Sequence, residues 1–285
     1  MVILFANPSS GRGKGAKVLS IIENFLRVSH EVFSSISTNS LERSLFLLRE
    51  SITKYPQAKI VVIGGDGMIH AAINNIKGNP IGLIPAGTGN DFARALGLSL
   101  EDPIGNIKRV LSADVEEVDL GKVGDEYFAA ICSTGFDSVV NERANKLKWP
   151  TGKMKYNIAM LLELPRFKPR SYEIVIDGKQ MQTQAMLIAI ANGLSYGGGM
   201  KVCPAANIQD GLLDIMILAP VPKLEFIRIF PSVFKGLHVT HPAVSILQGR
   251  SIQIKADAVA YADGERIGEL PLDVSISHNQ LKVLR

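Results

Sequence analysis

The stretch VVIGGDGMIHAAINN (61–75) decides the fold of this chain. It joins an apolar, β-rich run to a helix-like pattern through a loop of glycines that surround a single acid. These residues are Gly64, Gly65, Asp66 and Gly67. Glycines in such a loop permit positive φ and let a ligand approach the backbone closely. A strand, a glycine loop and a helix in this order are typical of a βα unit in a parallel sheet.

The same alternation continues over the first part of the chain. Strands are expected at 2–7, 30–36, 59–65 and 81–86, and helices at 14–27, 40–53, 67–76 and 90–97. This pattern predicts an α/β domain whose parallel sheet is covered by helices on both faces. Ligands of such sheets bind beyond the carboxyl ends of the strands. The glycine-rich segments 7–15, 64–67 and 86–89 all fall at that end.

After about residue 115 the pattern changes to short strand-like runs separated by turn signals. Helical patterns are confined to about 136–147, 152–164 and 223–236. We therefore expect a second, mainly antiparallel β-rich domain, built as a sandwich or a distorted barrel. The predicted domains are 1–118 and 119–285, and the last strand is a candidate to return to the first domain.

Composition narrows the class of protein. The chain has 285 residues, 46% of them hydrophobic and 20% charged, with a net charge of +4, which is too mild to prove an anionic partner. Cys132 and Cys203 form no C-x-x-C pair, so a disulfide framework or a zinc site is not expected. The N-terminus lacks the features of a signal peptide, and no apolar run reaches the ~18 residues that span a bilayer. We expect a cytoplasmic protein with at most peripheral membrane contact.

The loop NPSSGRGKGA (7–16) follows the first expected strand. It formally satisfies the dinucleotide pattern G-x-G-x-x-G/A, but the second strand ends at Thr38 without the acid that would hold a ribose. The Walker A pattern is also absent. What remains are polar side chains, exposed backbone N–H groups and a helix N-terminus, which together attract anions such as phosphate. The alternative is a flexible βα turn with solvated charges.

Asp66 has two interpretations. A carboxylate can lie close to phosphates only if a cation stands between them, and Mg²⁺ is the usual mediator. Alternatively, Asp66 caps a helix that begins at Gly67. The third loop, 84–97, repeats the pattern, with Thr88 between two glycines and with Asn90 or Asp91 as the cap of the next helix.

These three segments together resemble the diacylglycerol kinase catalytic-domain family, in particular its soluble bacterial lipid kinases. The family's N-P-x-S-G loop is similar to residues 7–11, its G-G-D-G-T loop to 64–68 and its P-x-G-T-x-N-D-F-A-R segment to 85–94. The resemblance continues through STGFDSVV, the long segment around NIQDGLLDI and YADGERI, and covers essentially the whole chain. One departure is Met68, which replaces the family's threonine and removes a hydroxyl from the loop.

The resemblance implies a fold like that of NAD kinases and phosphofructokinases, with ATP and Mg²⁺ as cofactors. It places the nucleotide on Asn7, Pro8, Ser9, Ser10, Gly11, Thr38, Gly64, Gly65, Asp66, Gly67, Gly87, Thr88, Asn90 and Asp91. It also implies a structural Mg²⁺ held by Asp210 with the backbone carbonyls of Asn207 and Leu212. Taken alone, that segment is a plain turn.

YADGERIG (261–268) holds Asp263 and Glu265 around Gly264. On a strand, positions i and i+2 face the same way, so the two carboxylates would share a face. The alternative is a turn with two solvated acids. In the family this motif is associated with activation of the acceptor hydroxyl. We favour Glu265 slightly as the base, with Asp263 as an orienting or metal-linked partner, although either could accept the proton.

Residues 143–170 are rich in basic side chains. Lysine or arginine stands at 143, 146, 148, 153, 155, 166, 168 and 170, against Glu163 alone. Basic residues mixed with Trp149 and aliphatic residues can hold a protein on an anionic leaflet. The alternative is a solvated surface beside an ordinary helix. No aromatic platform accompanies these charges, so nucleic-acid binding is not expected. The sequence leaves open whether the chain forms a homodimer.

The sequence therefore predicts a two-domain, Mg²⁺-dependent lipid kinase with its nucleotide in the interdomain cleft. It would transfer the γ-phosphate of ATP to a lipid alcohol, with diacylglycerol as the leading acceptor. The alternatives are a kinase of small molecules similar to NAD kinase, and an inactive nucleotide- or lipid-binding module of the same fold.

Overall fold

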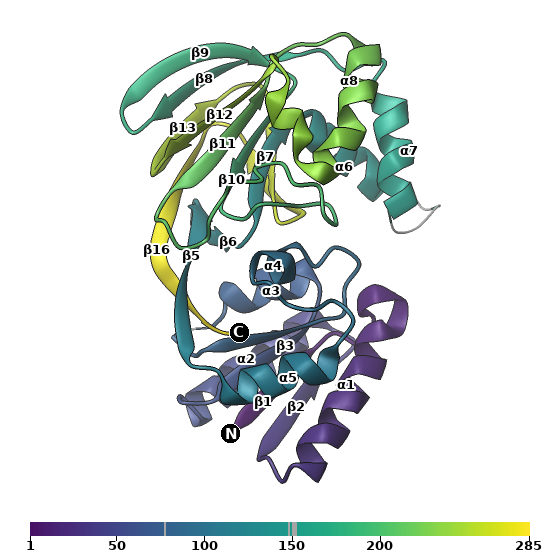
Figure 1. Ribbon diagram of the computed structural model, residues 1–285, viewed down its shortest axis with the longest axis vertical. Helices are drawn as coiled ribbons and strands as arrows, with labels where there is room; N and C mark the ends of the chain where they lie inside the picture. The colour runs from purple at the N-terminus through teal and green to yellow at the C-terminus, as the bar shows by residue number, and fades with distance from the viewer. Residues whose placement is uncertain (77, 148, 150–152) are drawn as a thin grey trace. The chain divides into compact units, whose positions relative to one another are not determined.

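The computed structural model describes residues 1–76, 78–147, 149 and 153–285. The contacts within the chain divide it into two compact units. Figure 1 colours the chain by residue number. Unit 1 contains Met1–Asp119 and His278–Arg285, and unit 2 contains Leu120–Ser277. The last strand of the chain therefore contributes residues to both units.

Unit 1 is built on a parallel sheet. Its strands are β1 (Val2–Ala6), β2 (Phe33–Ser37), β3 (Lys59–Gly64), β4 (Ile81–Pro85) and the end of β16 (Leu272–Leu284). They are ordered β2-β1-β3-β4-β16, and every neighbouring pair is parallel. Strands β1 and β4 are buried along their whole length, as expected when helices cover both faces. The predicted α/β class and its four strands are confirmed.

The helices of unit 1 are α1 (Ser10–Val28), α2 (Leu41–Lys54), α3 (Asp66–Ile73), α4 (Asp91–Ala95) and α5 (Pro103–Ser112). Helices α1 and α5 pack on one face of the sheet (Figure 1), where Ile22, Leu26 and Ile107 join one core cluster with β1 and β3. Helix α5 was missed by the sequence analysis. Its start is marked by Asp102, whose Oδ1 accepts a 2.7 Å hydrogen bond from Gly105 N, and by a proline at the first position.

Unit 2 is a β-sandwich. Its strands after β5 (Val115–Val123) are β6 (Glu126–Phe128), β7 (Ile131–Gly135), β8 (Arg170–Ile176), β9 (Lys179–Ala185), β10 (Leu187–Ala191), β11 (Leu213–Leu218), β12 (Val244–Gly249), β13 (Ser251–Lys255), β14 (Val259–Ala262) and β15 (Glu265–Glu269). An antiparallel sheet runs β12-β11-β10-β7-β14-β15, and β9-β8-β13-β16 forms the facing layer. Isoleucines of the first sheet and of β8 and β13 share one core cluster. The predicted sandwich is confirmed over the barrel.

Helices cover the outer face of the six-stranded sheet (Figure 1). They are α6 (Phe136–Lys146), α7 (Lys153–Glu163) and α8 (Lys223–Ile229), followed by the 3₁₀ segments η1 (Phe230–Lys235) and η2 (Leu237–Thr240). Phe136, Ala159 and Phe226 bring the three helices into one core cluster with β10 and β11. Among the described helices, none combines the length and the apolarity needed to cross a bilayer.

A buried carboxylate ties together the two strands that leave unit 1. Asp119 in β5 has no exposed surface. Its Oδ1 accepts a 2.8 Å hydrogen bond from Asn279 N and lies 2.7 Å from Nδ1 of His278, both in β16. Both strands also have residues in unit 2, and these bonds join β5 at its last residue inside unit 1 to β16 at its first residues there.

We predict that Asp119→Ala destabilises unit 1 far more than His278→Ala. The first change removes a fully buried carboxylate that accepts a hydrogen bond from Asn279 N, and it should cost about 2–4 kcal/mol in the free energy of unfolding. The second removes a half-exposed partner and should cost less than about 1 kcal/mol. Urea unfolding followed by circular dichroism measures both. Equal effects of the two variants would contradict the assignment of the bond from Asn279 N as the dominant one.

Candidate functional site

The three predicted loops meet at the carboxyl edge of the parallel sheet in unit 1. They follow β1, β3 and β4, which are adjacent strands. Asn7 N donates to Ile63 O at 3.3 Å, and Ala86 N donates to Gly64 O at 2.9 Å. A β-carbon at Gly11 would lie 2.3 Å from Ala86 O, so the first and third loops are in direct contact. The predicted convergence of these loops is therefore present in the structure.

Two of the glycines are required by the packing of one loop on another. A β-carbon at Gly87 would lie 2.3 Å from the Cα of Gly65, which is closer than any side chain could tolerate. A β-carbon at Gly89 would lie 2.3 Å from Oδ2 of Asp66. Packing of one loop on another therefore requires glycine at these positions around Asp66, in addition to any room that the glycines leave for a ligand.

Asp66 binds the start of α4. Its Oδ1 accepts hydrogen bonds from Asp91 N at 2.7 Å and from Phe92 N at 3.3 Å. Helix α3 begins at Asp66 itself, and its N-cap residue is Gly65. The predicted cap of a helix starting at Gly67 is therefore wrong, because the carboxylate reaches across to the N-terminus of the next helix. A negative charge at that position is favoured by the free N–H groups and the helix dipole.

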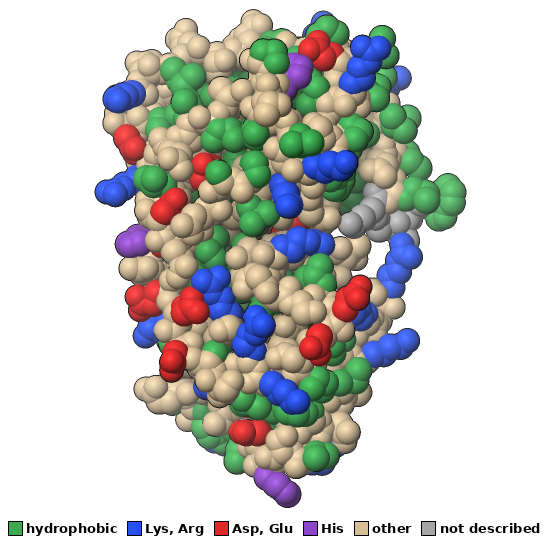
Figure 2. Space-filling model, viewed as in Figure 1, with side chains coloured by type: hydrophobic (Ala, Val, Ile, Leu, Met, Phe, Trp, Pro, Cys, Tyr) green, Lys and Arg blue, Asp and Glu red, His purple; other side chains and the backbone are tan. Residues whose placement is uncertain are grey.

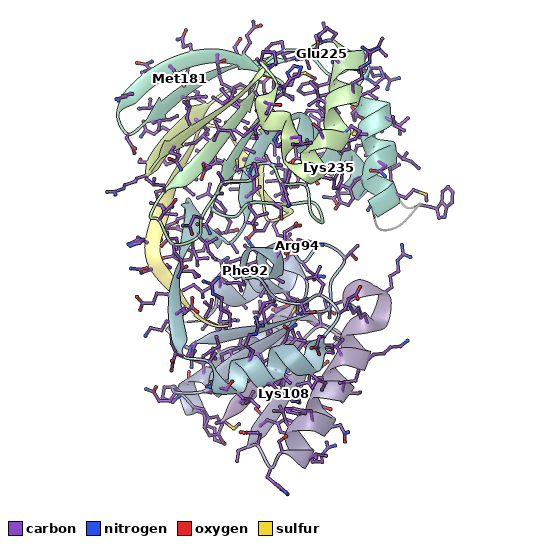
Figure 3. All side chains as sticks on the ribbon, viewed as in Figure 1. Phe92, Arg94, Lys108, Met181, Glu225 and Lys235 are labelled. Atoms are coloured by element: carbon purple, nitrogen blue, oxygen red, sulfur yellow. The ribbon has the colours of Figure 1, made fainter. Side chains whose placement is uncertain are left out.

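The third loop closes on itself through an amide. Gly87 N donates to Oδ1 of Asn90, and Nδ2 of Asn90 donates back to Gly87 O, both at 2.9 Å. Asn90 has φ +59° and makes no side-chain cap, so the predicted capping by Asn90 is wrong. Asp91 is buried, and its Oδ1 lies 3.3 Å from Nη1 of Arg94, which also donates to Gly89 O. Figure 3 labels Arg94 and Phe92 on this helix.

The first loop has an unusual backbone. Gly11, Arg12 and Gly13 have φ of +56°, +61° and +90°, so α1 starts with a left-handed kink. A non-glycine residue at positive φ is uncommon, and such strain is concentrated at functional sites. Oδ1 of Asn7 accepts from Ser9 N at 2.9 Å, and Nζ of Lys14 donates to Leu100 O at 3.2 Å. Successive backbone N–H groups in such turns form concavities that bind anions.

Thr38 and Met68, both singled out in the sequence, have structural roles. The hydroxyl of Thr38 donates to Ser40 O at 2.7 Å and lies 2.8 Å from the hydroxyl of Ser44, so it holds the turn into α2. Met68 is 5% exposed, and a β-carbon at Gly64 would lie 2.7 Å from its Cβ and Cγ. Position 68 thus points into the packed interior beside Gly64, where an apolar side chain is favoured.

In unit 2, the D-G-E motif is a tight hairpin. Strand β14 ends at Ala262 and β15 begins at Glu265, while Asp263 and Gly264 form the turn with φ of +51° and +91°. Aspartate followed by glycine is a strong hairpin signal because both central residues need positive φ. The expectation that the two acids share one face of a continuous strand is therefore wrong.

The two acids of this hairpin have different environments. The carboxylate of Asp263 accepts hydrogen bonds from Ala129 N at 2.7 Å, Ala130 N at 2.9 Å and Ile131 N at 3.2 Å. Glu265, by contrast, is exposed. Asp263 is thus bound to the backbone that leads from β6 into β7, whereas the side chain of Glu265 is open to solvent.

A further carboxylate of unit 2, that of Asp137, was missed by the sequence analysis. Asp137 lies in the first turn of α6, where its side chain accepts from the hydroxyl of Ser133 and, at 3.5 Å, from Nδ2 of Asn141. Burial raises the pKa of Asp137, and hydrogen bonds from Ser133 and Tyr196 lower it by a smaller amount. Burial is also the largest cause of the raised pKa of Tyr156, and the negative charges of Asp137 and Glu265 raise that pKa further. Asp137 lies in the stretch STGFDS, which carries part of the family resemblance, but the resemblance was given no role for this residue.

The predicted metal site is an exposed turn. Oδ1 of Asn207 accepts from Gln209 N at 3.1 Å, and Oδ1 of Asp210 accepts from Leu212 N at 3.0 Å. In the described ranges, no group of three or more His, Cys, Asp or Glu side chains could hold a metal. Asp214 is buried close by, and its pKa is raised by burial first and then by the charge of Asp210. Carboxylate and carbonyl oxygens fit Mg²⁺, with water completing the ligand set.

The basic segment 143–170 is only partly free. Nε of Arg143 forms an ion pair with Glu163, while Lys146, Arg166 and Lys168 are exposed. Lys148 and the side chain of Lys153 lie outside the described residues. Lys155 and Arg170 are half-buried, and Trp149 is exposed.

Comparisons with known proteins agree along the whole chain. Residues 1–123 match the family described as "Diacylglycerol kinase catalytic domain", and residues 130–285 match "YegS C-terminal NAD kinase beta sandwich-like domain". A protein of Mycobacterium tuberculosis (strain CDC 1551 / Oshkosh) named diacylglycerol kinase is 36% identical, covering 100% of this chain and 94% of the relative. One of Bacillus subtilis (strain 168) with the same name is 29% identical, covering 93% and 89%.

Solved structures share the fold. A diacylglycerol kinase of Bacillus anthracis str. Sterne superposes with a TM-score of 0.77 and 22% identity, covering 99% of this chain and 96% of the other. That likeness shows the fold, including the NAD kinase-like sandwich of unit 2, while the family follows from the sequence matches. The glycine loops around Asp66 and the hairpin of Asp263 stand in the two matched regions. The chain belongs to the diacylglycerol kinase catalytic domain family.

Proposed function

We propose that this chain is an ATP-dependent lipid kinase that transfers the γ-phosphate to a lipid hydroxyl, with diacylglycerol as acceptor and phosphatidic acid as product. The observation that carries the proposal is the end-to-end match to proteins named diacylglycerol kinase at up to 36% identity. The chain also keeps the acids of both loop regions, Asp66 in unit 1 and Asp263 with Glu265 in unit 2. With this activity, we infer that the enzyme is cytoplasmic and meets its lipid acceptor at a membrane surface.

The nucleotide would lie on the three loops of unit 1. The left-handed turn at Gly11–Gly13 offers backbone N–H groups to phosphate oxygens. Arg12 and Lys14 add positive charge to the first loop. Mg²⁺, when bound with the nucleotide, would neutralise phosphate charge, and Asp66 is the acid of these loops suited to hold it. The turn 207–212 would hold a second, structural Mg²⁺ through Asp210.

The acceptor would be activated by the hairpin of unit 2. As the lipid oxygen bonds to the γ-phosphorus, the bond to the β-bridging oxygen breaks and ADP leaves. The hydroxyl proton passes to the carboxylate of Glu265, which is exposed and can accept it. Asp263 positions this group, because its own oxygens are bound to three backbone N–H groups.

The proposed activity is tested with γ-labelled ATP and diacylglycerol in detergent micelles. Label should appear in phosphatidic acid and only in the presence of Mg²⁺. A panel that includes other lipid alcohols and NAD identifies the acceptor. Transfer to NAD and to no lipid would overturn the proposal, and ATP binding without any transfer would identify an inactive module.

In the same assay, Glu265→Gln should lower kcat by roughly 10²–10⁴-fold, because the amide is a very poor proton acceptor. The KM for ATP should change little. Asp263→Asn should also lower kcat, and it should lower the thermal midpoint, since an amide replaces a carboxylate that faces three N–H donors. Glu269→Gln, an exposed change at the other end of β15, is the matched control. A Glu265→Gln enzyme with wild-type kcat would remove Glu265 from the mechanism.

We further predict that Asp66→Asn lowers kcat by at least about 10²-fold while the protein stays folded. The amide oxygen of asparagine can still accept from Asp91 N and Phe92 N, so the variant removes the charge more than the loop contact. Gly89→Ala is the complementary variant, because its methyl would displace Oδ2 of Asp66 without removing the charge. Mg²⁺ titrations of kcat measure both.

These two variants separate the roles of Asp66. If Asp66→Asn kept more than half of the activity while Gly89→Ala lost it, the carboxylate would act only by holding the loops together. Loss in both variants, with a higher Mg²⁺ requirement for Asp66→Asn, is the expected result.

A further inference from the structure

A stripe of polar side chains runs along α6 in unit 2, next to the side of the helix that is buried. Asp137, Asn141 and Asn145 lie four positions apart and therefore share one side of the helix. We call these three residues the polar stripe. The apolar side of α6 packs in the core cluster of the helical layer. Polar groups at the border of such a core are costly unless they find partners.

The polar stripe is bound to side chains of the sheet. Asp137 accepts hydrogen bonds from the hydroxyl of Ser133 in β7 and from Tyr196. Asn145 is hydrogen-bonded to the hydroxyl of Tyr261 in β14. Ser133 and Tyr261 are opposite each other in the antiparallel pair of β7 and β14, so both point to the side of the sheet that α6 covers. The polar stripe therefore lies over the strand that leads into the D-G-E hairpin.

Tyr156 of α7 is close to the same place. It precedes Ala159 and Met160 by three and four positions, and both of these pack in the core cluster of the helical layer. The side chain of Tyr156 is nevertheless 44% exposed. Burial, followed by the charges of Asp137 and Glu265, raises the pKa of its phenol. The hydroxyl of Tyr156 is therefore within electrostatic reach of both acids, one on α6 and one on the hairpin.

The hydroxyl of Tyr156 is free to bind a ligand. Across the residues that the structure describes, it makes no hydrogen bond, whereas Tyr196 and Tyr261 are both bonded to the polar stripe. A phenol has one proton to donate, and ionised carboxylates only accept. A ligand that reaches Tyr156 and Glu265 together must therefore offer an acceptor to the phenol and a proton to the acid.

The elements around this place are joined to one another. Oε1 of Glu142 on α6 lies 3.5 Å from Nε of Arg266 in β15, and Arg143 on α6 pairs with Glu163 at the end of α7. Charge at the surface would not single the place out, because Figure 2 shows acidic, basic and hydrophobic side chains intermixed over the helices of unit 2. What distinguishes it is a free phenol held beside the proposed base by helices that are tied to the hairpin.

Diacylglycerol offers the pair of groups that this place needs. Its free hydroxyl has the proton that passes to Glu265 in the proposed reaction. The neighbouring carbon of the glycerol carries an ester, whose carbonyl oxygen can only accept a hydrogen bond. A phosphate headgroup in the same position would bring negative charge next to two acids, which is unfavourable.

We propose that Tyr156 binds the acceptor by donating a hydrogen bond from its phenol to the ester carbonyl next to the reacting hydroxyl, in a subsite that Asp137 and Glu265 border. The inference rests on the proposed function, because it assigns the group of the lipid acceptor that unit 2 recognises. Tyr156 thereby selects a neutral lipid with an ester beside its free hydroxyl. A phenol that only packed α7 against α6 would be indifferent to the chemistry of the acceptor.

The test compares ester and ether acceptors in detergent micelles, with γ-labelled ATP as donor. Dialkylglycerol has the hydroxyl and the chains of diacylglycerol but no carbonyl. Wild type should show a kcat/KM for diacylglycerol that is roughly two- to tenfold above that for dialkylglycerol, as expected for one neutral hydrogen bond. Tyr156→Phe should lower kcat/KM for diacylglycerol by the same factor, chiefly through KM, and should leave that for dialkylglycerol nearly unchanged.

Two mixed lipids locate the carbonyl. The lipid with an ester only at the carbon next to the reacting hydroxyl should behave as diacylglycerol does. The lipid with an ester only at the far carbon should behave as dialkylglycerol does. Tyr55→Phe is the matched control, since Tyr55 is 38% exposed and lies in unit 1, and it should change neither value. Thermal melting checks the fold of both variants.

Three outcomes would overturn the inference. Equal losses of Tyr156→Phe on diacylglycerol and dialkylglycerol would assign the phenol a packing role, which does not depend on a carbonyl. A wild type that uses both lipids equally well, or a Tyr55→Phe effect as large as that of Tyr156→Phe, would also contradict it. Failure of wild type to phosphorylate any of the four lipids would overturn the proposed function itself, so the two failures give different results.

Discussion

The carboxylate of Asp66 is the constraint on which the candidate nucleotide site depends. It accepts two backbone hydrogen bonds from the start of α4 and so joins the β3–α3 loop to the β4–α4 loop. That contact is possible only because Gly65 and Gly87 touch backbone to backbone and Gly89 leaves room for the second oxygen. One half-buried acid and three missing side chains therefore fix the edge of the sheet where βα folds bind their ligands.

Unit 2 uses the same physical device on a different framework. Asp263 binds three consecutive backbone N–H groups and holds the tip of a hairpin in place, as Asp66 holds a helix start. The three backbone donors occupy the oxygens of Asp263, whereas Glu265 is exposed. In the proposed reaction we therefore favour Glu265 as the base, a distinction that the sequence alone left open. Preorganised groups of this kind cost little reorganisation during a reaction.

Much of the fold was predictable because its signals are local. The apolar runs of β1, β3 and β4 and the glycines after them are properties of contiguous sequence, as is the start of α5 at Asp102-Pro103, although it was overlooked. The hairpin at Asp263-Gly264 was also locally encoded, and treating it as continuous strand put both acids on one face in error. The bond from Asp66 to Asp91 joins residues 25 positions apart, and no local pattern reports it. The same holds for the ion pair of Glu163 with Arg143, which joins α7 to α6.

The buried position of Met68 bears on whether the first turn of α3 needs a hydroxyl. The side chain at 68 points at Gly64 and is 5% exposed, so a smaller, polar residue there would lie against the interior of unit 1 rather than in the loop opening. Phosphate binding at this edge would then come from backbone N–H groups, which every residue but proline supplies. Such binding tolerates a change of side chain as long as the glycines keep the backbone where it is. On this argument the methionine adds packing at a position that the chemistry does not use, and the acids and glycines around it are what the proposed reaction requires.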